Sequence, residues 1–158
     1  MSTVTSTLTV NAAFLQEIKD DDTQLQVMLQ TLVTELRRAR PYRITLRRLH
    51  QRLEGLRDQL ATHFSLEETF GYFEDAVSVA PRLSIKADQL QAEHEALFLQ
   101  ICSMVERIEQ SLAPENPQLT IDDVAAEFSR FHQRFRDHET EENELIMQAF
   151  GEDIGVGD

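Results

Sequence analysis

Apolar residues recur along most of this chain at alternating steps of three and four residues, the spacing that puts side chains on one face of an α-helix. Short segments that contain proline, serine or asparagine separate the stretches with this pattern. The pattern predicts helices over residues 11–39, 41–76, 84–112 and 120–150. Because the connections are short, each helix is expected to run antiparallel to the next one. This predicts an all-α, up-down-up-down four-helix bundle.

The predicted bundle occupies residues 11–150, with a polar segment on either side. Residues 1–10 are rich in serine and threonine and are expected to form a flexible N-terminal lead, and residues 151–158 an acidic C-terminal tail. Residues that favour helix ends or breaks set the helix limits: Asn11, Ser84 and Thr120 as N-caps, Pro41 in a first turn, and Gly71 as a weak point within a helix.

The helix faces that are predicted to point into the core are apolar except at six positions. They are Asp22, His63, Glu67, His94, His138 and Glu142. At about 1.5 Å of rise per residue, counting from the helix ends places all six at one depth in the bundle, within the error of the helix limits. The sequence therefore predicts that three imidazoles and three carboxylates, from four helices, meet in one layer of an apolar core.

Such a layer needs a physical reason, because an unpaired buried carboxylate costs several kcal/mol or takes up a proton. His63 and Glu67 are spaced i, i+4, as are His138 and Glu142, so each pair lies on one helix face. Carboxylates and neutral imidazoles are ligands of transition metals, and two such pairs on facing helices favour two metal ions over one. The alternative is a metal-free polar network in which the histidines and carboxylates satisfy one another.

Three short segments hold five of the six residues: His63-Phe64-Ser65-Leu66-Glu67-Glu68, Glu93-His94-Glu95 and His138-Glu139-Thr140-Glu141-Glu142. These segments resemble the hemerythrin-like (HHE cation-binding) domain family, and the resemblance extends from about Phe14 to Phe150. It implies a non-haem di-iron centre with two iron ions, ferrous or ferric, joined by an oxo or hydroxo bridge. It also implies that Glu67 and Glu142 bridge the irons and that the histidines are terminal ligands.

The chain departs from the family pattern at two positions. The family usually has a histidine in the first helix, where this sequence has Asp22, and oxygen-carrying members have a second histidine in the third helix, where this sequence has Phe98. The second departure is shared with a family branch tied to nitric oxide and oxidative-stress responses. We expect Asp22 and His63 to hold one metal, and His94 and His138 the other. Asp22 is a hard ligand that favours ferric iron, and its presence leaves manganese or zinc as alternative occupants.

About four protein donors for each metal fall short of the six that iron commonly takes, which leaves positions for small ligands. The predicted protein therefore binds, senses or reduces dioxygen, peroxide or nitric oxide, and whether it acts as an enzyme is left open. Two alternatives are a non-enzymatic sensor whose metal or redox state changes partner binding, and a metal-poor or metal-free bundle that acts as a regulatory or interaction module. An apolar wall around the layer is expected from Phe64, Phe98, Phe128, Phe131 and Phe135.

Composition narrows the list of partners. The 158 residues include 28 acidic and 15 basic side chains, and the net charge of −13 disfavours nucleic acids and anionic membranes. No stretch has the apolar length of a membrane span, and the N-terminal residues lack a signal-peptide pattern. The single cysteine, Cys102, excludes a disulfide within the chain. We expect a cytoplasmic monomer or homodimer, partnered by a small diatomic ligand or peroxide and by an unidentified redox partner.

Four other polar residues lie close to the predicted core faces. His50 and His132 flank apolar positions and are interpreted as surface or flanking histidines rather than ligands. Glu68 and Glu141 adjoin the proposed ligands in sequence. They are expected to be solvated. Alternatively, either one could hydrogen-bond to a ligand from outside or replace a ligand.

Overall fold

The computed structural model describes residues 20–37, 43–69, 72–116 and 119–157. Helices make up almost all of this part of the chain, and no strand occurs in it. A first helix covers residues 20–35. It is followed by α2 (Leu46–Thr69), α3 (Tyr72–Val79), the 3-10 turn η1 (Pro81–Leu83), α4 (Ser84–Ser111) and α5 (Ile121–Gly157). The fold is therefore all-α, as predicted.

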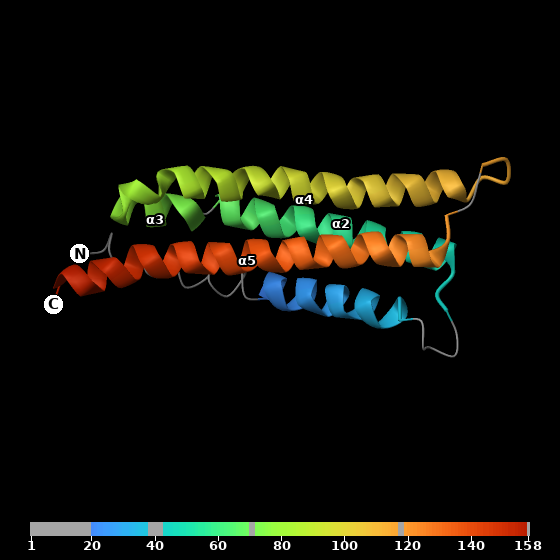
Figure 1. Cartoon of the computed structure of the whole chain (residues 1–158), viewed down its shortest axis with the longest axis horizontal. Coiled ribbons are helices and arrows are strands. Elements are labelled where there is room, and N and C mark those ends of the chain that lie inside the picture. The colour runs from blue at the N-terminus through green and yellow to red at the C-terminus, as the bar shows by residue number, and fades with distance from the viewer. Residues whose placement is uncertain (1–19, 38–42, 70–71, 117–118, 158) are drawn as a thin grey trace, which may run out of the picture.

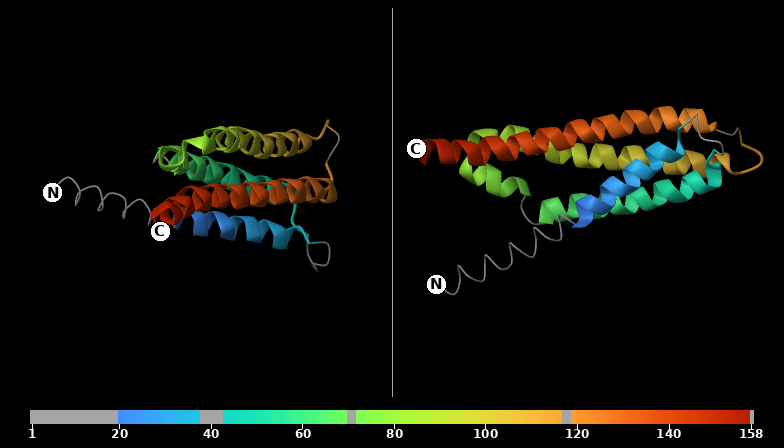
Figure 2. Two further views of the ribbon diagram at one scale, coloured as in Figure 1. Left: turned by 60° about the vertical axis from the view of Figure 1, so that its left-hand side comes forward. Right: turned by 90° about the horizontal axis from the view of Figure 1, so that it is seen from below.

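The four long helices lie side by side along a common direction (Figure 1). The first helix, drawn in blue, and α4 run one way, whereas α2 and α5 run the other way, so helices that follow one another in the chain are antiparallel. The short helix α3 lies between the end of α2 and the start of α4, and the views in Figure 2 show the same arrangement. This is the up-down-up-down bundle that the hydrophobic pattern predicts.

Side-chain caps fix the beginnings of two long helices. The Thr45 hydroxyl accepts a hydrogen bond from the Arg48 amide at 3.1 Å, just before α2. At the start of α5 the amide of Asp123 donates to the Thr120 hydroxyl at 3.1 Å, and the Asp123 carboxylate accepts from the Thr120 amide at 3.3 Å. These bonds satisfy amides that have no partner within the helix. The predicted cap at Thr120 is therefore confirmed, and α2 begins after Thr45 rather than at Pro41.

The structure also corrects where three helices end. The predicted helix over residues 41–76 is two helices, because α2 ends at Thr69 and α3 begins at Tyr72. The first helix ends at residue 35 rather than near Ala39. The helix predicted to end near Phe150 continues to Gly157, since a glycine inside a helix costs only about 1 kcal/mol and does not by itself end it.

Some predictions fall on parts of the chain that the structure does not describe. The N-terminal lead at residues 1–10, the N-cap at Asn11 and the break at Arg40-Pro41 lie outside the described residues. Gly71, the predicted weak point between α2 and α3, also lies outside them.

Two apolar clusters form the core. The larger one joins the first helix, α2, α4 and α5 and contains Leu29, Leu53, Ile101 and Phe131 among its buried members. The smaller one joins α3, η1, the start of α4 and the later part of α5. Within the described residues, none of the helices combines the length and the apolar character that crossing a membrane requires.

Candidate metal centre

Five of the six predicted site residues come together between the two apolar clusters. His63 and Glu67 come from α2, His94 from α4, and His138 and Glu142 from α5. Each of the five side chains is at least nine-tenths buried. The i, i+4 spacing on α2 and α5 places the histidine and the glutamate of each pair one helical turn apart on the same face, as predicted. We call these five residues the polar layer.

The Glu67 carboxylate lies between two imidazoles. One of its oxygens is 2.9 Å from His63 Nε2, and the other is 3.2 Å from His94 Nε2. Each oxygen of one carboxylate thus faces a different histidine, on a different helix. This is the arrangement in which a carboxylate can join two cations, each held by one of the histidines.

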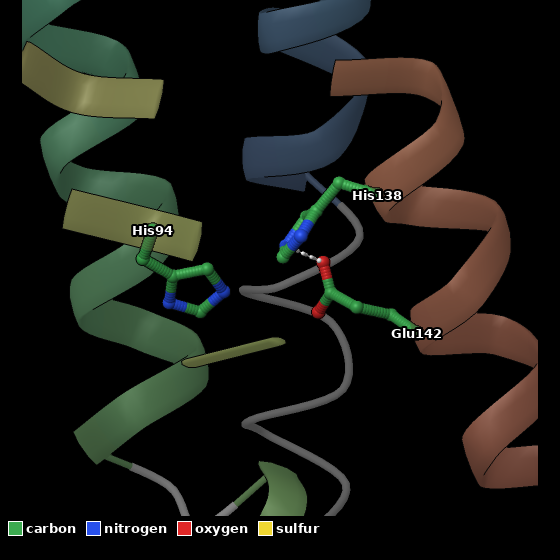
Figure 3. Close-up of side chains that lie close together, drawn as sticks. All are labelled: His94, His138 and Glu142. Atoms are coloured by element: carbon green, nitrogen blue, oxygen red, sulfur yellow. Dashed lines mark ion pairs between the residues drawn. The ribbon is translucent and has the colours of Figure 1, made fainter. Parts of the chain in front are cut away.

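On the other side of the polar layer, His138 Nε2 is 2.6 Å from a Glu142 oxygen. Figure 3 shows this pair on α5, facing His94 on α4 across the interior of the bundle. One ligand atom from each of His94, His138 and Glu142 lies within 4.8 Å of the others. These three donors therefore surround a space of the size that a single metal ion occupies.

The first helix places Asp21, and not Asp22, against the polar layer. Asp21 is buried, and its carboxylate accepts a hydrogen bond from His63 Nδ1 at 2.7 Å. Asp22 is only half-buried and lies near Glu139, whose pKa is raised by burial and then by the charge of Asp22. The prediction that Asp22 is buried in this layer is thus wrong. Adjacent residues of a helix point about 100° apart, so when Asp21 faces the polar layer Asp22 does not. Its role as a metal ligand stays a prediction.

Carboxylates outside the polar layer hold the outer nitrogens of its histidines. His63 Nδ1 contacts Asp21, His94 Nδ1 is 3.1 Å from Glu68, and His138 Nδ1 is 2.9 Å from Glu93. For Glu68 this outer contact is one of the alternative roles expected from the sequence, whereas the sequence pattern points to no role for Asp21 or Glu93. The role of Glu93 could have been inferred from its position next to His94 in the sequence. That position places Glu93 on the adjoining face of α4, where it contacts His138 of α5.

Burial and mutual charge shift the pKa values of three groups in the polar layer. Burial opposes the charging of His63, but the adjacent carboxylates of Glu67 and Asp21 outweigh it and raise its pKa to about 9. Burial acts against the ionised form of Glu67, yet His63 and His94 lower its pKa to about 2. Burial and the neighbouring Glu67 charge raise the pKa of Glu142 to about 9. Without a cation, the two inner carboxylates therefore share their site as one ionised and one protonated group.

The inner atoms of the polar layer lack hydrogen-bond partners. Within the described residues, six buried side-chain atoms make no hydrogen bond: His50 Nε2, away from the polar layer, and His63 Nε2, Glu67 Oε2, His94 Nε2, His138 Nε2 and Glu142 Oε2 in it. Buried polar atoms without partners are rare in proteins, because each costs about 1–3 kcal/mol. In the polar layer these atoms are imidazole nitrogens and carboxylate oxygens, which are metal-ligand atoms, and they point toward one another. Four of the five lie 2.6–3.2 Å from an oppositely charged atom of the polar layer, but none of these contacts has hydrogen-bond geometry. The polar layer therefore fits cations, which all five atoms could bind.

Aromatic rings surround the polar layer. Phe64 stacks on the His94 ring with centroids 4.1 Å apart and an interplanar angle of 9°. Phe135 meets the edge of the His63 ring at 6.1 Å, and Phe73 of α3 lies 5.8 Å from His94. Of the predicted phenylalanine wall, Phe64 and Phe135 contact the histidines directly. Phe128 and Phe131 lie farther along the same buried face, in the larger apolar cluster.

A surface groove of about 580 Å³ reaches the polar layer from outside, between α2 and α4. Phe64, Glu68, His94 and Phe98 are among the residues that line it. Phe98 is therefore a half-buried groove residue rather than a core residue. Phe64 and the His94 ring on which it lies flat both line the groove, so the groove reaches one histidine of the polar layer.

The two histidines that were interpreted as non-ligands lie outside the polar layer. His50 pairs with Glu54 at 3.1 Å, one turn along α2. His132 stacks on Phe128 with an interplanar angle of 16°, and burial followed by the charge of Arg136 lowers its pKa. Glu141, the other residue with an open role, pairs with Lys86 at 3.3 Å on the surface.

The chain matches the hemerythrin HHE cation-binding domain family over residues 13–150. The match covers most of the chain and every residue of the polar layer. This chain belongs to that family. No curated protein and no solved structure matches it. The hemerythrin HHE domain is a cation-binding helical domain, and in this member the imidazole and carboxylate cluster of the polar layer fits that role.

Proposed function

We propose that this hemerythrin HHE domain is a non-haem di-iron protein that binds, senses or reduces dioxygen, peroxide or nitric oxide. The observation that carries the proposal is the set of five inward-facing donor atoms, all buried and without hydrogen-bond partners among the described residues. Two carboxylates and three neutral imidazoles suit iron, whereas a structural zinc site has four ligands around one ion.

The chain offers donors for two ions. His94 and His138 would hold one ion and His63 the other, with Glu67 and Glu142 as carboxylate ligands that both ions would share. The two oxygens of Glu67, which face His63 and His94 separately, support this division. Asp22 is proposed to complete the His63 side by turning inward from its half-buried position on the first helix. Manganese or zinc remains the alternative occupant of this side, because it has a single histidine.

Each half of the site has fewer protein donors than the six that iron commonly takes. Iron, when bound, supplies electrons and vacant positions at which a small ligand can attach. The protein's own part is to exclude water and to restrict access. Phe64 and Phe135 pack against the histidines, and the stacked rings of Phe64 and His94 line the groove between α2 and α4. A diatomic gas or peroxide is small enough to pass such a ring after a modest side-chain movement.

Iron loading tests the proposal directly. The purified protein is incubated anaerobically with ferrous iron, desalted and assayed for metal, and its absorption spectrum is recorded after oxidation. We expect two irons per chain and charge-transfer bands of ferric iron. A Glu67→Gln variant should lose most of the iron, whereas His132→Gln, a histidine change outside the polar layer, should retain it. Wild-type protein that takes up no iron contradicts the proposal.

The alternative function is a metal-poor or metal-free bundle that acts as a regulatory or interaction module. The observation that favours it is the first helix, which places a carboxylate where the family usually has a histidine and buries Asp21 against His63 instead. Charged His63 between Asp21 and Glu67 is a stable arrangement without any metal. This function predicts wild-type protein that binds no iron under the same conditions and remains fully folded.

A further inference from the structure

Each histidine of the polar layer is held from outside by a carboxylate of the long helix that precedes it in the chain. Asp21 of the first helix holds His63 of α2, Glu68 of α2 holds His94 of α4, and Glu93 of α4 holds His138 of α5. The distances are 2.7, 3.1 and 2.9 Å, all within hydrogen-bond range. The three contacts therefore link all four long helices at the level of the polar layer.

The chemistry of these contacts fixes which nitrogen carries the proton. An ionised carboxylate only accepts hydrogen bonds, so each imidazole must donate its Nδ1–H outward. In the neutral imidazole this leaves the Nε2 lone pair free, and the three Nε2 atoms are the ones that point inward without hydrogen-bond partners. The outer carboxylates thus select the tautomer that can bind a cation inside the polar layer.

We propose that Asp21, Glu68 and Glu93 are positioning residues for the metal centre. In this proposal the first helix contributes to the centre by orienting His63 through Asp21. The proposal rests on the proposed function, because it assigns the three residues to the same two ions. Glu68 and Glu93 orient the two histidines of one ion, and Asp21 orients the single histidine of the other. The two halves of the centre are therefore tuned by different helices.

The surroundings of the three carboxylates predict which of them affects metal binding most. The Asp21 side chain is 5% exposed, and its second oxygen accepts a hydrogen bond from Gln59 Nε2 at 2.6 Å. The side chains of Glu68 and Glu93 are 42% and 34% exposed, so water screens their charges. Gln59 and His63 contact different oxygens of Asp21, and an asparagine at position 21 replaces one of these acceptors by an NH2 group that donates. Loss of Asp21 should therefore have the largest effect.

The test measures ferrous iron binding by anaerobic competition with a coloured chelator, in the full chain. Changes of metal-binding partners of this kind lower affinity by about 10- to 100-fold. We expect Asp21→Asn to weaken one of the two binding steps by an amount in this range, and Glu93→Gln to weaken the other step less strongly. The matched control is Glu35→Gln, because Glu35 is a partly buried carboxylate that binds Arg52 at 3.1 Å, away from the polar layer. It should leave both binding steps unchanged.

A second readout detects the tautomers themselves. In zinc-loaded protein, long-range proton–nitrogen correlation spectra of the histidine side chains should show Nδ1–H and a metal-bound Nε2 for His63, His94 and His138. Asp21→Asn should change the signals of His63 alone, and Glu93→Gln those of His138 alone. A merely structural role for the carboxylates would lower stability without this residue-by-residue correspondence.

The outcomes separate this inference from the proposed function. If the wild type binds two metal ions and the Asp21→Asn and Glu93→Gln variants bind as tightly as the wild type, the positioning role is overturned and the proposed function stands. If the wild type binds neither iron nor zinc, the proposed function fails first. Should Asp21→Asn not fold, the Glu93→Gln variant decides the question, since its carboxylate is partly exposed and its loss leaves no buried charge.

Discussion

The carboxylates of Glu67 and Glu142 have opposite pKa shifts although they lie in the same layer. Glu67 is flanked by two imidazoles that favour its ionised form, whereas burial and the Glu67 charge disfavour ionisation of Glu142. The metal-free protein therefore carries an extra proton at this position, and a bound cation would displace it. Metal loading should accordingly be tighter at higher pH.

The pKa values of the polar layer predict how the stability of the metal-free protein depends on pH. A group with a higher pKa in the folded chain than in the unfolded chain makes stability fall as pH rises between the two values. For Glu142 this interval runs from 4.5 to about 9, and for His63 from 6.5 to about 9. The pKa of Glu67 is lowered to about 2, so its contribution to stability is lost as the pH falls from 4.5 to about 2. We expect the free energy of unfolding to drop by on the order of 2 kcal/mol or more between about pH 5 and pH 9.

Urea denaturation of chelator-treated protein at a series of pH values measures this slope. Glu142→Gln is the informative variant, because an amide keeps the shape of the side chain and does not titrate. It should flatten the dependence and be more stable than the wild type at pH 9. An unchanged slope in this variant would contradict the assignment of the proton to Glu142.

His94→Leu distinguishes a metal centre from a metal-free polar layer. In metal-free protein the change replaces a buried imidazole, whose Nε2 lies 3.2 Å from Glu67 without making a hydrogen bond, by an apolar side chain. Glu67 keeps its other partner, His63, at 2.9 Å, so stability should rise by about 1 kcal/mol or more. In iron-loaded protein it should remove iron and lower the melting temperature, because the metal stabilises the fold by binding. Thermal unfolding with and without iron measures both effects. His132→Leu is the control, and it should leave the iron content unchanged. A lower stability of the metal-free variant would contradict this prediction.

The sequence was sufficient to predict five members of the polar layer, because i, i+4 pairs and apolar neighbours fix the face on which those residues lie. It did not distinguish Asp21 from Asp22. Leu25 is buried, and positions three and four residues before it lie on the same side of a helix, so hydrophobic spacing admits either one. The outer carboxylates were not predictable for a related reason. Their partners are on neighbouring helices, and the rotation of one helix against another is a property of the packed bundle.

At the scale of the elements, the sequence predicted the number and direction of the long helices better than their ends. Thr45 and Pro41 both favour a helix start, and the packed structure uses Thr45 as the cap of α2. Gly151 favoured an end to α5, but its backbone does not adopt the left-handed conformation with which glycines commonly end helices. A single capping or helix-breaking residue is a weak predictor of a helix end when the turns on either side of it can still form helical hydrogen bonds.

Gly55, in the interior of α2, offers a stabilising substitution. Alanine is favoured over glycine inside a helix by about 1 kcal/mol. A Cβ at this position would lie 3.2 Å from the terminal methyl of Met28, the flexible end of a side chain that can move by a few tenths of an ångström. We expect Gly55→Ala to raise the free energy of unfolding by about 0.5 kcal/mol, as measured by urea denaturation.

Gly151→Ala is the matched control for this substitution, because its Cβ would meet no atom within 4 Å. It reports the gain in helix propensity alone, and the difference between the two variants is the cost of moving Met28. Iron content should be unchanged in both, since neither residue touches the polar layer. A Gly55→Ala variant less stable than the wild type would show that Met28 is held rigidly between the first helix and α2.

At the scale of the whole molecule, the polar layer divides the core into two unequal parts. The larger cluster has buried side chains from four long helices, and the smaller one depends on α3, η1, and the adjoining parts of α4 and α5. Leu90 and Leu97 lie on opposite sides of the polar layer along α4, as do Phe135 and Leu145 along α5. A metal-free layer with unpartnered atoms therefore weakens the connection between a large stable core and a small one.

This division predicts where metal binding stabilises the protein. Among the described residues the smaller cluster has eight buried members, fewer than the larger one, and the polar layer lies between the two. We therefore expect the larger cluster to stay folded without metal and the smaller one to depend on the polar layer. We expect amide hydrogen exchange in metal-free protein to be fast in α3, at the start of α4 and beyond Glu142 in α5, and slow near Leu53 and Ile101. Iron loading should slow exchange by at least about tenfold in the first group, a difference of about 1.4 kcal/mol, and change the second group little. Uniform protection across both clusters, or no change on loading, would show that the two parts unfold as one unit and that the polar layer is not the link between them.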